Sequence, residues 1–266
     1  MKLSDTYFDF ELQYRPEEWK SWSSTFEGRW LGVPIAICYV FVIFGIKWAM
    51  EKKERWELKK ALILWNFGLA VFSWWGSLRM VPYWWDLVSS KGVDFTLCDD
   101  SVYRNPVTSF WICLFVWSKI FELFDTVFVV LRKQRLIFLH WYHHATVVFL
   151  SFANWHAWPG IGIWQTTMNF SVHSIMYSFY MVRAMGFKPP KIINMIITSL
   201  QIFQMIIACL FGARTFFWII SGSKCGTDNI YTSGLAFGIY FSYLILFLQF
   251  FQTTYFSRSR TLKKID

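Results

Sequence analysis

Seven long apolar stretches constrain the fold of this chain more than any other feature. A helix needs about 20 consecutive apolar residues to cross a bilayer. Stretches of roughly this length occupy 31–50, 61–78, 107–131, 136–155, 161–181, 192–212 and 234–255. Only 16% of the residues are charged and 55% are hydrophobic, which is too little charge for the surface of a soluble domain. The sequence therefore predicts an all-α polytopic membrane protein, a single domain over residues 1–266 with seven transmembrane helices.

Lysine and arginine gather on one side of the predicted spans. Seven crossings place the termini on opposite sides, and a cytosolic C-terminus puts 16 Lys and Arg against 4 Asp and Glu on its side. The other side then holds 9 basic and 11 acidic residues. This asymmetry follows the positive-inside rule, so we expect a lumenal N-terminus and a cytosolic C-terminus. The net charge of +9 then reflects orientation, and nucleic-acid binding is not needed to explain it.

Two further features favour the endoplasmic reticulum. The tail, 256–266, ends in KKID, which has the form of a cytosolic dilysine retrieval signal, an address read by a receptor. Cys98 and Cys225 fall in two loops that the charge pattern places in the lumen. The lumen permits disulfides, so we predict a bridge between them.

Polar side chains inside the spans gather at one depth. A helix rises 1.5 Å per residue, so the histidines at 140–144 lie roughly 7–14 Å from the basic cluster that ends at Arg135. His173, on the next span, lies about 15 Å from Arg183. Several other polar residues share this belt on the cytosolic half: Asn66, Lys119, Glu122, Asp125, Gln201, Gln249 and Gln252.

The spacing of these residues is helical. His140, His143 and His144 share one helix face, and so do Lys119, Glu122 and Thr126 on the third span. A similar stripe runs along the fifth span through Asn169, His173, Tyr177 and Tyr180. Ionisable groups inside a membrane face a protein interior or a wet cavity, where they can pair. The pattern predicts a chamber that opens towards the cytosol.

The histidines are compatible with three kinds of site. A histidine-ligated di-iron centre, as in membrane oxidases and hydroxylases, needs several such clusters, whereas this chain has 5 histidines in all. A single zinc with three histidine ligands remains compatible with the sequence. Acid–base or nucleophilic chemistry by imidazole is also compatible with it, and so is hydrogen bonding between helices. We expect imidazole chemistry, with no bound metal or cofactor.

Four motifs carry a family resemblance. KIFELFDT (119–126), LIFLHWYHH (136–144), MNFSVHSIMYSFY (168–180) and TSLQIFQM (198–205) resemble, in order, the four signatures of the ELO family of very-long-chain fatty-acid elongases. RKQRLIFLHWYHH is most similar to the animal members that act on saturated and monounsaturated chains of about palmitate length. The chain departs from the usual pattern at Phe179, where relatives commonly have Tyr, and around Gln204.

The resemblance implies a 3-ketoacyl-CoA synthase, which condenses acyl-CoA with malonyl-CoA and releases CoA and carbon dioxide. It implies an acyl-imidazole on His143, with His173 as the opposed imidazole. His140 and His144 would set the histidine tautomers and shuttle protons, and Asn169 would supply a further hydrogen-bond donor. The predicted supporting residues are Lys119, Glu122, Asp125, Tyr177, Tyr180 and Gln204. The predicted CoA-binding residues are Arg132, Lys133, Arg135, Lys188 and Lys191.

Partners follow from the implied reaction. A ketoacyl-CoA reductase, a 3-hydroxyacyl-CoA dehydratase and an enoyl-CoA reductase would complete the two-carbon cycle, in the lipid bilayer, and a homodimer is compatible with the sequence. Helices two to seven would enclose a narrow acyl-chain tunnel. The alternatives are a metal-dependent membrane oxidase and a seven-span receptor or transporter. Receptors do not need an ionisable belt on the cytosolic side, and the repeat symmetry typical of transporters is not found.

Overall fold

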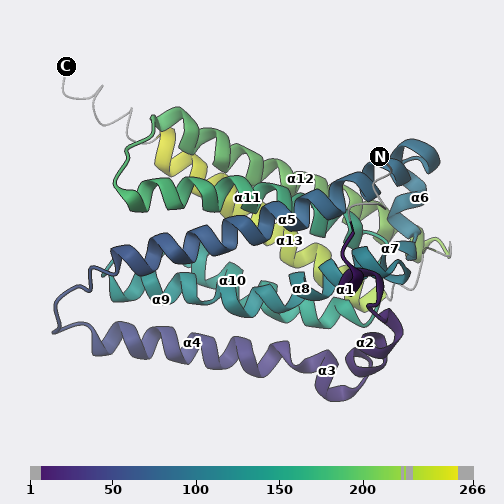
Figure 1. Cartoon of the computed structure of the whole chain (residues 1–266), viewed down its shortest axis with the longest axis horizontal. Coiled ribbons are helices and arrows are strands. Elements are labelled where there is room, and N and C mark those ends of the chain that lie inside the picture. Colours follow the sequence, from purple (N-terminus) through teal and green to yellow (C-terminus); the bar gives the residue numbers. More distant parts are fainter. Residues whose placement is uncertain (1–6, 223–224, 226–229, 257–266) are drawn as a thin grey trace.

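The computed structural model describes residues 7–222, 225 and 230–256, and these residues form helices and connecting loops without a β-strand (Figure 1). This confirms the all-α prediction. The long helices are α4 (Gly32–Ala49), α5 (Lys59–Lys91), α8 (Pro106–Glu122), α9 (Phe124–Leu131), α10 (Phe138–Trp155), α11 (Gly162–Met185), α12 (Lys191–Ile220) and α13 (Ile230–Phe251). The short ones are α1 (Asp9–Leu12), α2 (Pro16–Ser23), α3 (Phe26–Trp30), α6 (Val93–Cys98), α7 (Ser101–Arg104) and a π-helical turn at Gln252–Phe256.

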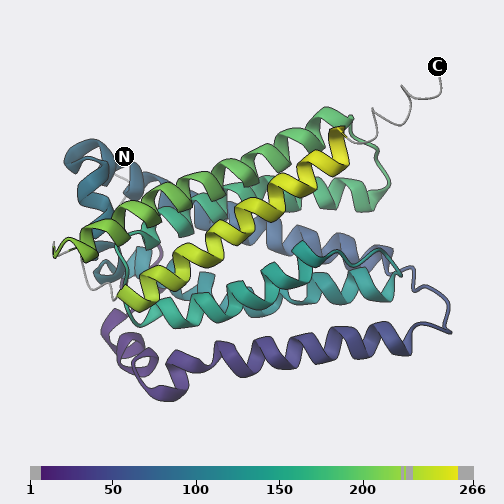
Figure 2. The same ribbon diagram turned by 180° about the vertical axis from the view of Figure 1, so that it is seen from behind.

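The chain is a multi-pass membrane protein. Four helices among the described residues are long and apolar enough to cross a bilayer: Phe26–Ala49, Lys59–Lys91, Lys191–Ile220 and Ile230–Phe256. The other three predicted spans correspond to α8 with α9, α10 and α11, which run alongside them (Figure 2). These helices carry the histidines, Lys119, Glu122 and Asn169, so they are less apolar. Seven crossings stay a prediction.

Local sequence explains where several helices begin and end. The Asn105 side chain accepts hydrogen bonds from the backbone N–H groups of Val107 and Thr108, which caps α8, and Pro106 occupies its first turn. Both features are typical of a helix N-terminus. At the other end of the bundle, α11 stops at Gly186, whose φ of 111° is a left-handed conformation that favours glycine.

The third predicted span is not one continuous helix. The sequence predicted an unbroken helix over 107–131, but α8 ends at Glu122 and α9 begins at Phe124. At the junction, Leu123 N–H bonds to the Ile120 carbonyl and Thr126 N–H bonds to the Leu123 carbonyl. These i to i−3 bonds are tighter than those of an α-helix. The junction separates the contacts of Lys119 and Glu122 from those of Asp125 and Thr126.

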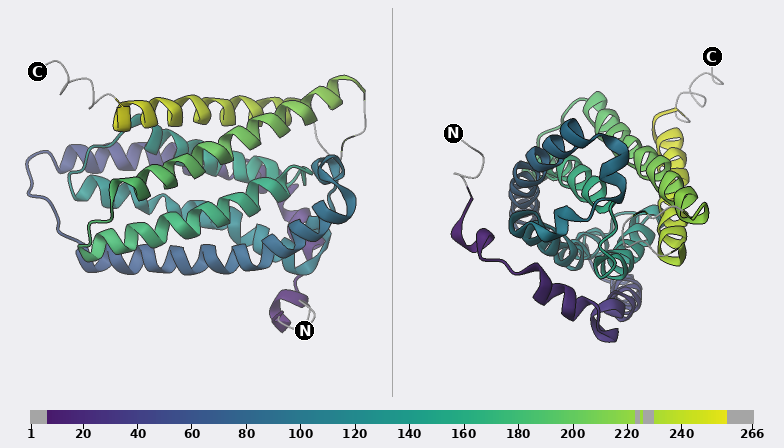
Figure 3. Two further views of the ribbon diagram at one scale, coloured as in Figure 1. Left: turned by 90° about the horizontal axis from the view of Figure 1, so that it is seen from above. Right: turned by 90° about the vertical axis from the view of Figure 1, so that its right-hand side faces the viewer.

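Six helices form a closed ring. Around it, α5 packs on α11, α11 on α12, α12 on α13, α13 on α10, α10 on α8, and α8 on α5. Helix α4 lies outside this ring, against α10 and α9 (Figure 3, right). The ring is the arrangement that the predicted tunnel requires, and the tunnel itself stays a prediction.

The two ends of the bundle differ in character (Figure 3, left). We call one the basic end, because its loops, 50–58, 132–137 and 186–190, and the helix ends beside them carry 12 of the 20 lysines and arginines of the described residues. We call the other the disulfide end; it holds α1–α3, α6, α7 and the disulfide between Cys98 and Cys225. The predicted retrieval signal, residues 263–266, lies outside the described residues.

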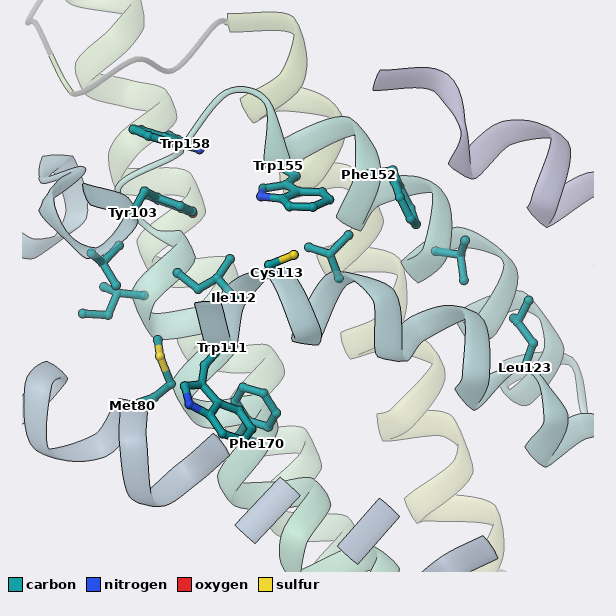
Figure 4. Packing of buried hydrophobic residues seen from close by; sticks show 14 of the residues in the cluster. Met80, Tyr103, Trp111, Ile112, Cys113, Leu123, Phe152, Trp155, Trp158 and Phe170 are labelled. Carbon is teal, nitrogen blue, oxygen red and sulfur yellow. The ribbon is translucent and has the colours of Figure 1, made fainter. Parts of the chain in front are cut away.

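Aromatic side chains fill the ring at the disulfide end (Figure 4). Trp158 is fully buried and stacks on Tyr103 with 5.5 Å between ring centroids. Tyr103 Oη donates to the Pro159 carbonyl at 3.1 Å. These contacts join the α10–α11 turn to α7 and close this end of the ring.

The segment before α2 is anchored to the ring by one carboxylate. Glu11 is fully buried and pairs with Arg79 Nε of α5 at 2.8 Å. Trp111 Nε1 of α8 donates to the same Glu11 oxygen at 2.6 Å, and the Phe8 backbone N–H donates to the other one. A buried charge requires such pairing, so Glu11 fixes this segment to α5 and α8.

Candidate active site

Four side chains form a closed circuit between α8 and α11. Lys119 Nζ lies 2.7 Å from Glu122 Oε1 and donates to Asn169 Oδ1 at 3.0 Å. Asn169 Nδ2 lies 3.2 Å from His173 Nε2. His173 Nδ1 lies 3.8 Å from Glu122 Oε2, which closes the circuit by proximity and not by a hydrogen bond, because Glu122 Oε2 has no hydrogen-bond partner among the described residues. All four were predicted as site residues from spacing, and the structure brings them together.

The circuit fixes where its protons lie. An ammonium group can only donate, so Lys119 makes Asn169 Oδ1 an acceptor and leaves the Asn169 amide N–H groups as donors. One of them points to His173 Nε2, which must then accept. The ring proton of neutral His173 is therefore on Nδ1, facing the Glu122 carboxylate. The other Asn169 amide proton remains available to a bound molecule.

The three histidines of α10 lie close together but differ in their partners. The His140 and His144 ring centroids are 4.6 Å apart, and those of His143 and His144 are 5.5 Å apart. His140 Nε2 is hydrogen-bonded to Thr126 Oγ1 at 3.0 Å. Within the described part of the chain, the His143 ring makes no hydrogen bond; it packs against Tyr243 of α13 with 4.9 Å between centroids. Among the described residues, His144 has no hydrogen bond either, but of the three histidines it is His143 that lines the cavity.

An internal cavity begins at His143. It has space of about 60 Å³ for the centres of water molecules, enough for several waters. His143, Asn169 and the predicted residue Gln204 line it, and it extends to Tyr103, Trp155 and Pro159 at the disulfide end. A free imidazole and an amide donor thus face one cavity, a combination suited to nucleophilic attack on a carbonyl group.

Asp125 has a supporting place beside this site. Its carboxylate accepts from Trp65 Nε1 at 2.6 Å and from Tyr177 Oη at 2.7 Å, so it does not join the Lys119–Glu122 pair. The Tyr177 ring packs on His173 with 5.3 Å between centroids. Tyr180, predicted in the same stripe, is 41% exposed, and its ring packs on Tyr177 with 6.4 Å between centroids.

The predicted CoA-binding residues lie at the basic end. Arg132, Lys133 and Arg135 are in the loop before α10, and Lys188 and Lys191 are beside the start of α12. Lys133 Nζ donates to the Glu51 carbonyl at 3.1 Å, and the Trp56 N–H donates to the Leu131 carbonyl at 3.0 Å. The loop 50–58, with its own lysines, therefore lies beside this cluster.

Two residues at the site were not predicted from sequence. Tyr39 of α4 is hydrogen-bonded to Thr126, and Tyr243 of α13 covers His143. Tyr39 is the one tyrosine in the stretch 31–50, which is a weak signal because tyrosines are also enriched at membrane–water interfaces for reasons unrelated to a site. Among the described residues, no group of three or more His, Cys, Asp or Glu is arranged to hold a metal ion.

Comparison with known proteins gives consistent matches over nearly the full length. The family model described as "ELO: GNS1/SUR4 family" matches residues 25–263. Very long chain fatty acid elongase 6 of Gallus gallus is 40% identical over 261 residues, covering 97% of this chain and 96% of the relative. The Homo sapiens elongase of the same name is 39% identical with the same coverage. Very long chain fatty acid elongase 3 of Homo sapiens is 38% identical over 252 residues, covering 93% and 89%.

Proposed function

The chain belongs to the ELO (GNS1/SUR4) family, and from this membership we propose that it is the condensing enzyme of a fatty-acid elongation cycle. It joins an acyl-CoA to malonyl-CoA and forms a 3-oxoacyl-CoA, CoA and carbon dioxide, with no bound cofactor. The names of its relatives support elongation of fatty acids. The observation that carries the chemistry is His143, an unbonded imidazole in the cavity that Asn169 also lines.

The first half-reaction transfers the acyl group to the protein. A His143 ring nitrogen attacks the thioester carbonyl, the carbon–sulfur bond breaks, and CoA leaves. The acylated imidazole loses its other ring proton, which neutralises the departing thiolate by way of the neighbouring histidines. The oxyanion that forms during attack is stabilised by the free Asn169 amide proton, with His173 as the opposed imidazole that orients the group.

The second half-reaction extends the chain. Malonyl-CoA loses its carboxylate as carbon dioxide, and the resulting enolate attacks the acyl carbon. The carbon–nitrogen bond to His143 breaks, and the imidazole regains a proton. Lys119 and Glu122 hold Asn169 and His173 in place through both steps. Overall, one proton is taken up, one carbon–carbon bond forms, and no electron acceptor is required.

The bundle orients the two parts of the substrate. We place the basic end in the cytosol, where Arg132, Lys133, Arg135, Lys188 and Lys191 meet the CoA phosphates. The disulfide end then faces the lumen of the endoplasmic reticulum, and the acyl chain extends inside the ring towards that end. Trp158 and Tyr103 close that end. Each buried methylene contributes about 0.8 kcal/mol, so the closed end selects chain length.

The location and partners of the protein follow from the same proposal. Seven crossings place the N-terminus in the lumen and the KKID tail in the cytosol, as a retrieval signal to the endoplasmic reticulum. A ketoacyl-CoA reductase, a 3-hydroxyacyl-CoA dehydratase and an enoyl-CoA reductase act on the product in turn.

A condensation assay on purified protein tests the proposal. It uses labelled malonyl-CoA, a series of saturated and monounsaturated acyl-CoAs, and no NADPH. Wild type should form labelled 3-oxoacyl-CoA, and His143→Ala should form none. His156→Ala removes the histidine at the disulfide end and should retain activity. If wild type forms no product with any acyl-CoA, the proposed function is wrong.

A further inference from the structure

A hydrogen-bonded chain runs from the outer helix into the histidine cluster. Tyr39 Oη of α4 lies 2.7 Å from Thr126 Oγ1 of α9, and Thr126 Oγ1 lies 3.0 Å from His140 Nε2 of α10. Tyr39 is 5% exposed and Thr126 is 0% exposed. Helix α4 lies outside the six-helix ring, and these two hydrogen bonds connect it to the site.

The direction of these hydrogen bonds follows from counting donors. Among the described residues, Thr126 is the one hydrogen-bond partner of the Tyr39 hydroxyl. A buried hydroxyl that failed to donate would carry the full cost of desolvation, so Tyr39 donates to Thr126. Thr126 has one proton of its own, which then goes to His140 Nε2. That nitrogen accepts, and the ring proton of neutral His140 lies on Nδ1.

We infer that Tyr39 and Thr126 are positioning residues that hold His140 in its Nδ1–H tautomer. The inference rests on the proposed function, in which His140 and His144 move the proton that His143 gives up and regains. With Nε2 occupied by Thr126, the His140 proton available to the neighbouring imidazoles is the one on Nδ1. The His144 ring is 4.6 Å away, and its buried Nδ1 has no hydrogen-bond partner among the described residues.

The geometry separates this role from simple attachment of α4. Apolar contacts already pack α4 on α10; Phe44, for example, packs on Trp141 with 5.6 Å between centroids. A hydroxyl pair that served only to join helices has no reason to end on a ring nitrogen of the histidine motif. The inference therefore predicts an effect on the histidine rather than on the packing of the helix.

The tautomer can be measured without any activity. The wild-type protein is labelled with 15N-histidine in micelles, and two-bond 15N–1H correlations show which ring nitrogen carries the proton. The His140 signals are those lost in His140→Gln. We expect an unprotonated Nε2 in wild type, and a mixture of tautomers in Tyr39→Phe and Thr126→Val. The control Tyr83→Phe removes the hydroxyl that bonds Ser101, away from the site, and should leave the spectrum unchanged. A wild-type His140 protonated on Nε2 overturns the inference.

Steady-state condensation kinetics test the consequence. Loss of one hydrogen bond at a histidine should lower kcat roughly tenfold in Thr126→Val, with KM for acyl-CoA nearly unchanged. Thr126→Ser keeps the hydroxyl and should restore most of kcat. If Tyr39→Phe and Thr126→Val lower the melting temperature but leave kcat unchanged, the two residues only join helices and the inference is wrong. If wild type is inactive, the proposed function fails, while the NMR result still decides the tautomer.

Discussion

The buried pair of Lys119 and Glu122 gives the sharpest energetic prediction. Their charged atoms are 2.7 Å apart, and the side chains are 2% and 4% exposed. At an effective dielectric constant near 20, two unit charges at this distance attract by about 6 kcal/mol. Desolvation of both groups offsets most of that attraction. Removing one partner therefore costs far more than the net contribution of the pair.

We expect Lys119→Met alone to lower the free energy of unfolding by roughly 3–5 kcal/mol, because it leaves the Glu122 carboxylate buried without its ammonium. Glu122→Leu should cost a similar amount. The double variant removes both charges and should recover much of the loss, which gives a coupling energy of at least about 2 kcal/mol.

The assay is a double-mutant cycle, with unfolding followed by SDS titration in mixed micelles. Asp100 and Arg104 form the matched control, a pair at 2.6 Å whose side chains are 22% and 58% exposed. An exposed pair contributes about 0.2–1 kcal/mol. If the Lys119 and Glu122 effects are additive, or no larger than the control, the argument from burial is refuted.

Three further predictions concern the disulfide end. Burial acts to raise the pKa of Glu11, but hydrogen bonds from Arg79, Phe8 and Trp111 outweigh it and lower that pKa. The resulting stability is present above the ordinary carboxyl pKa and lost as the pH falls through the lowered one. The melting temperatures of wild type and Glu11→Gln should therefore converge in acid, and a constant difference would contradict this. Cys98→Ser opens a bridge between residues 127 apart in sequence and should cost roughly 2–5 kcal/mol; dithiothreitol should destabilise wild type and leave the variant unaffected. In Gly162→Ala, the new Cβ would clash with Tyr103 Oη, beside the cavity, so the variant should accept only shorter acyl-CoAs. Gly238→Ala, with open space around it, should keep the wild-type chain-length profile, and equal profiles in both variants would contradict the proposed path of the chain.

Helical spacing was enough to predict much of the site. His140, His143 and His144 were placed on one face, Lys119, Glu122 and His173 at one depth, and Asn169 in one stripe with His173, because depth and direction follow from 1.5 Å and 100° per residue. The structure joins Lys119, Glu122 and Asn169 to His173 and clusters the three histidines of α10, and of these seven residues His143 and Asn169 line the cavity. Spacing also placed Tyr180 in the stripe, but Tyr180 is exposed. Helical spacing gives the face on which a residue lies and does not give what packs against that face.

Other features depend on contacts that a single sequence does not encode locally. The break at Leu123 lies in a segment, KIFELFDT, that contains neither Gly nor Pro, so no helix-breaking signal marks it. Its consequence is that Asp125 binds Trp65 and Tyr177 rather than Lys119. The contact of Tyr39 with Thr126 joins residues 87 apart in sequence and arises only when α4 packs on α9.

The most direct test of the account is peptide mass spectrometry of the protein after incubation with palmitoyl-CoA and no malonyl-CoA. We expect one acyl group on His143 and release of an equal amount of free CoA. Addition of malonyl-CoA should remove the acyl group as 3-oxoacyl-CoA. An acyl group found on a cysteine or on another histidine would contradict the assignment of His143. Condensation without any acylated intermediate would contradict the acyl-imidazole mechanism as a whole.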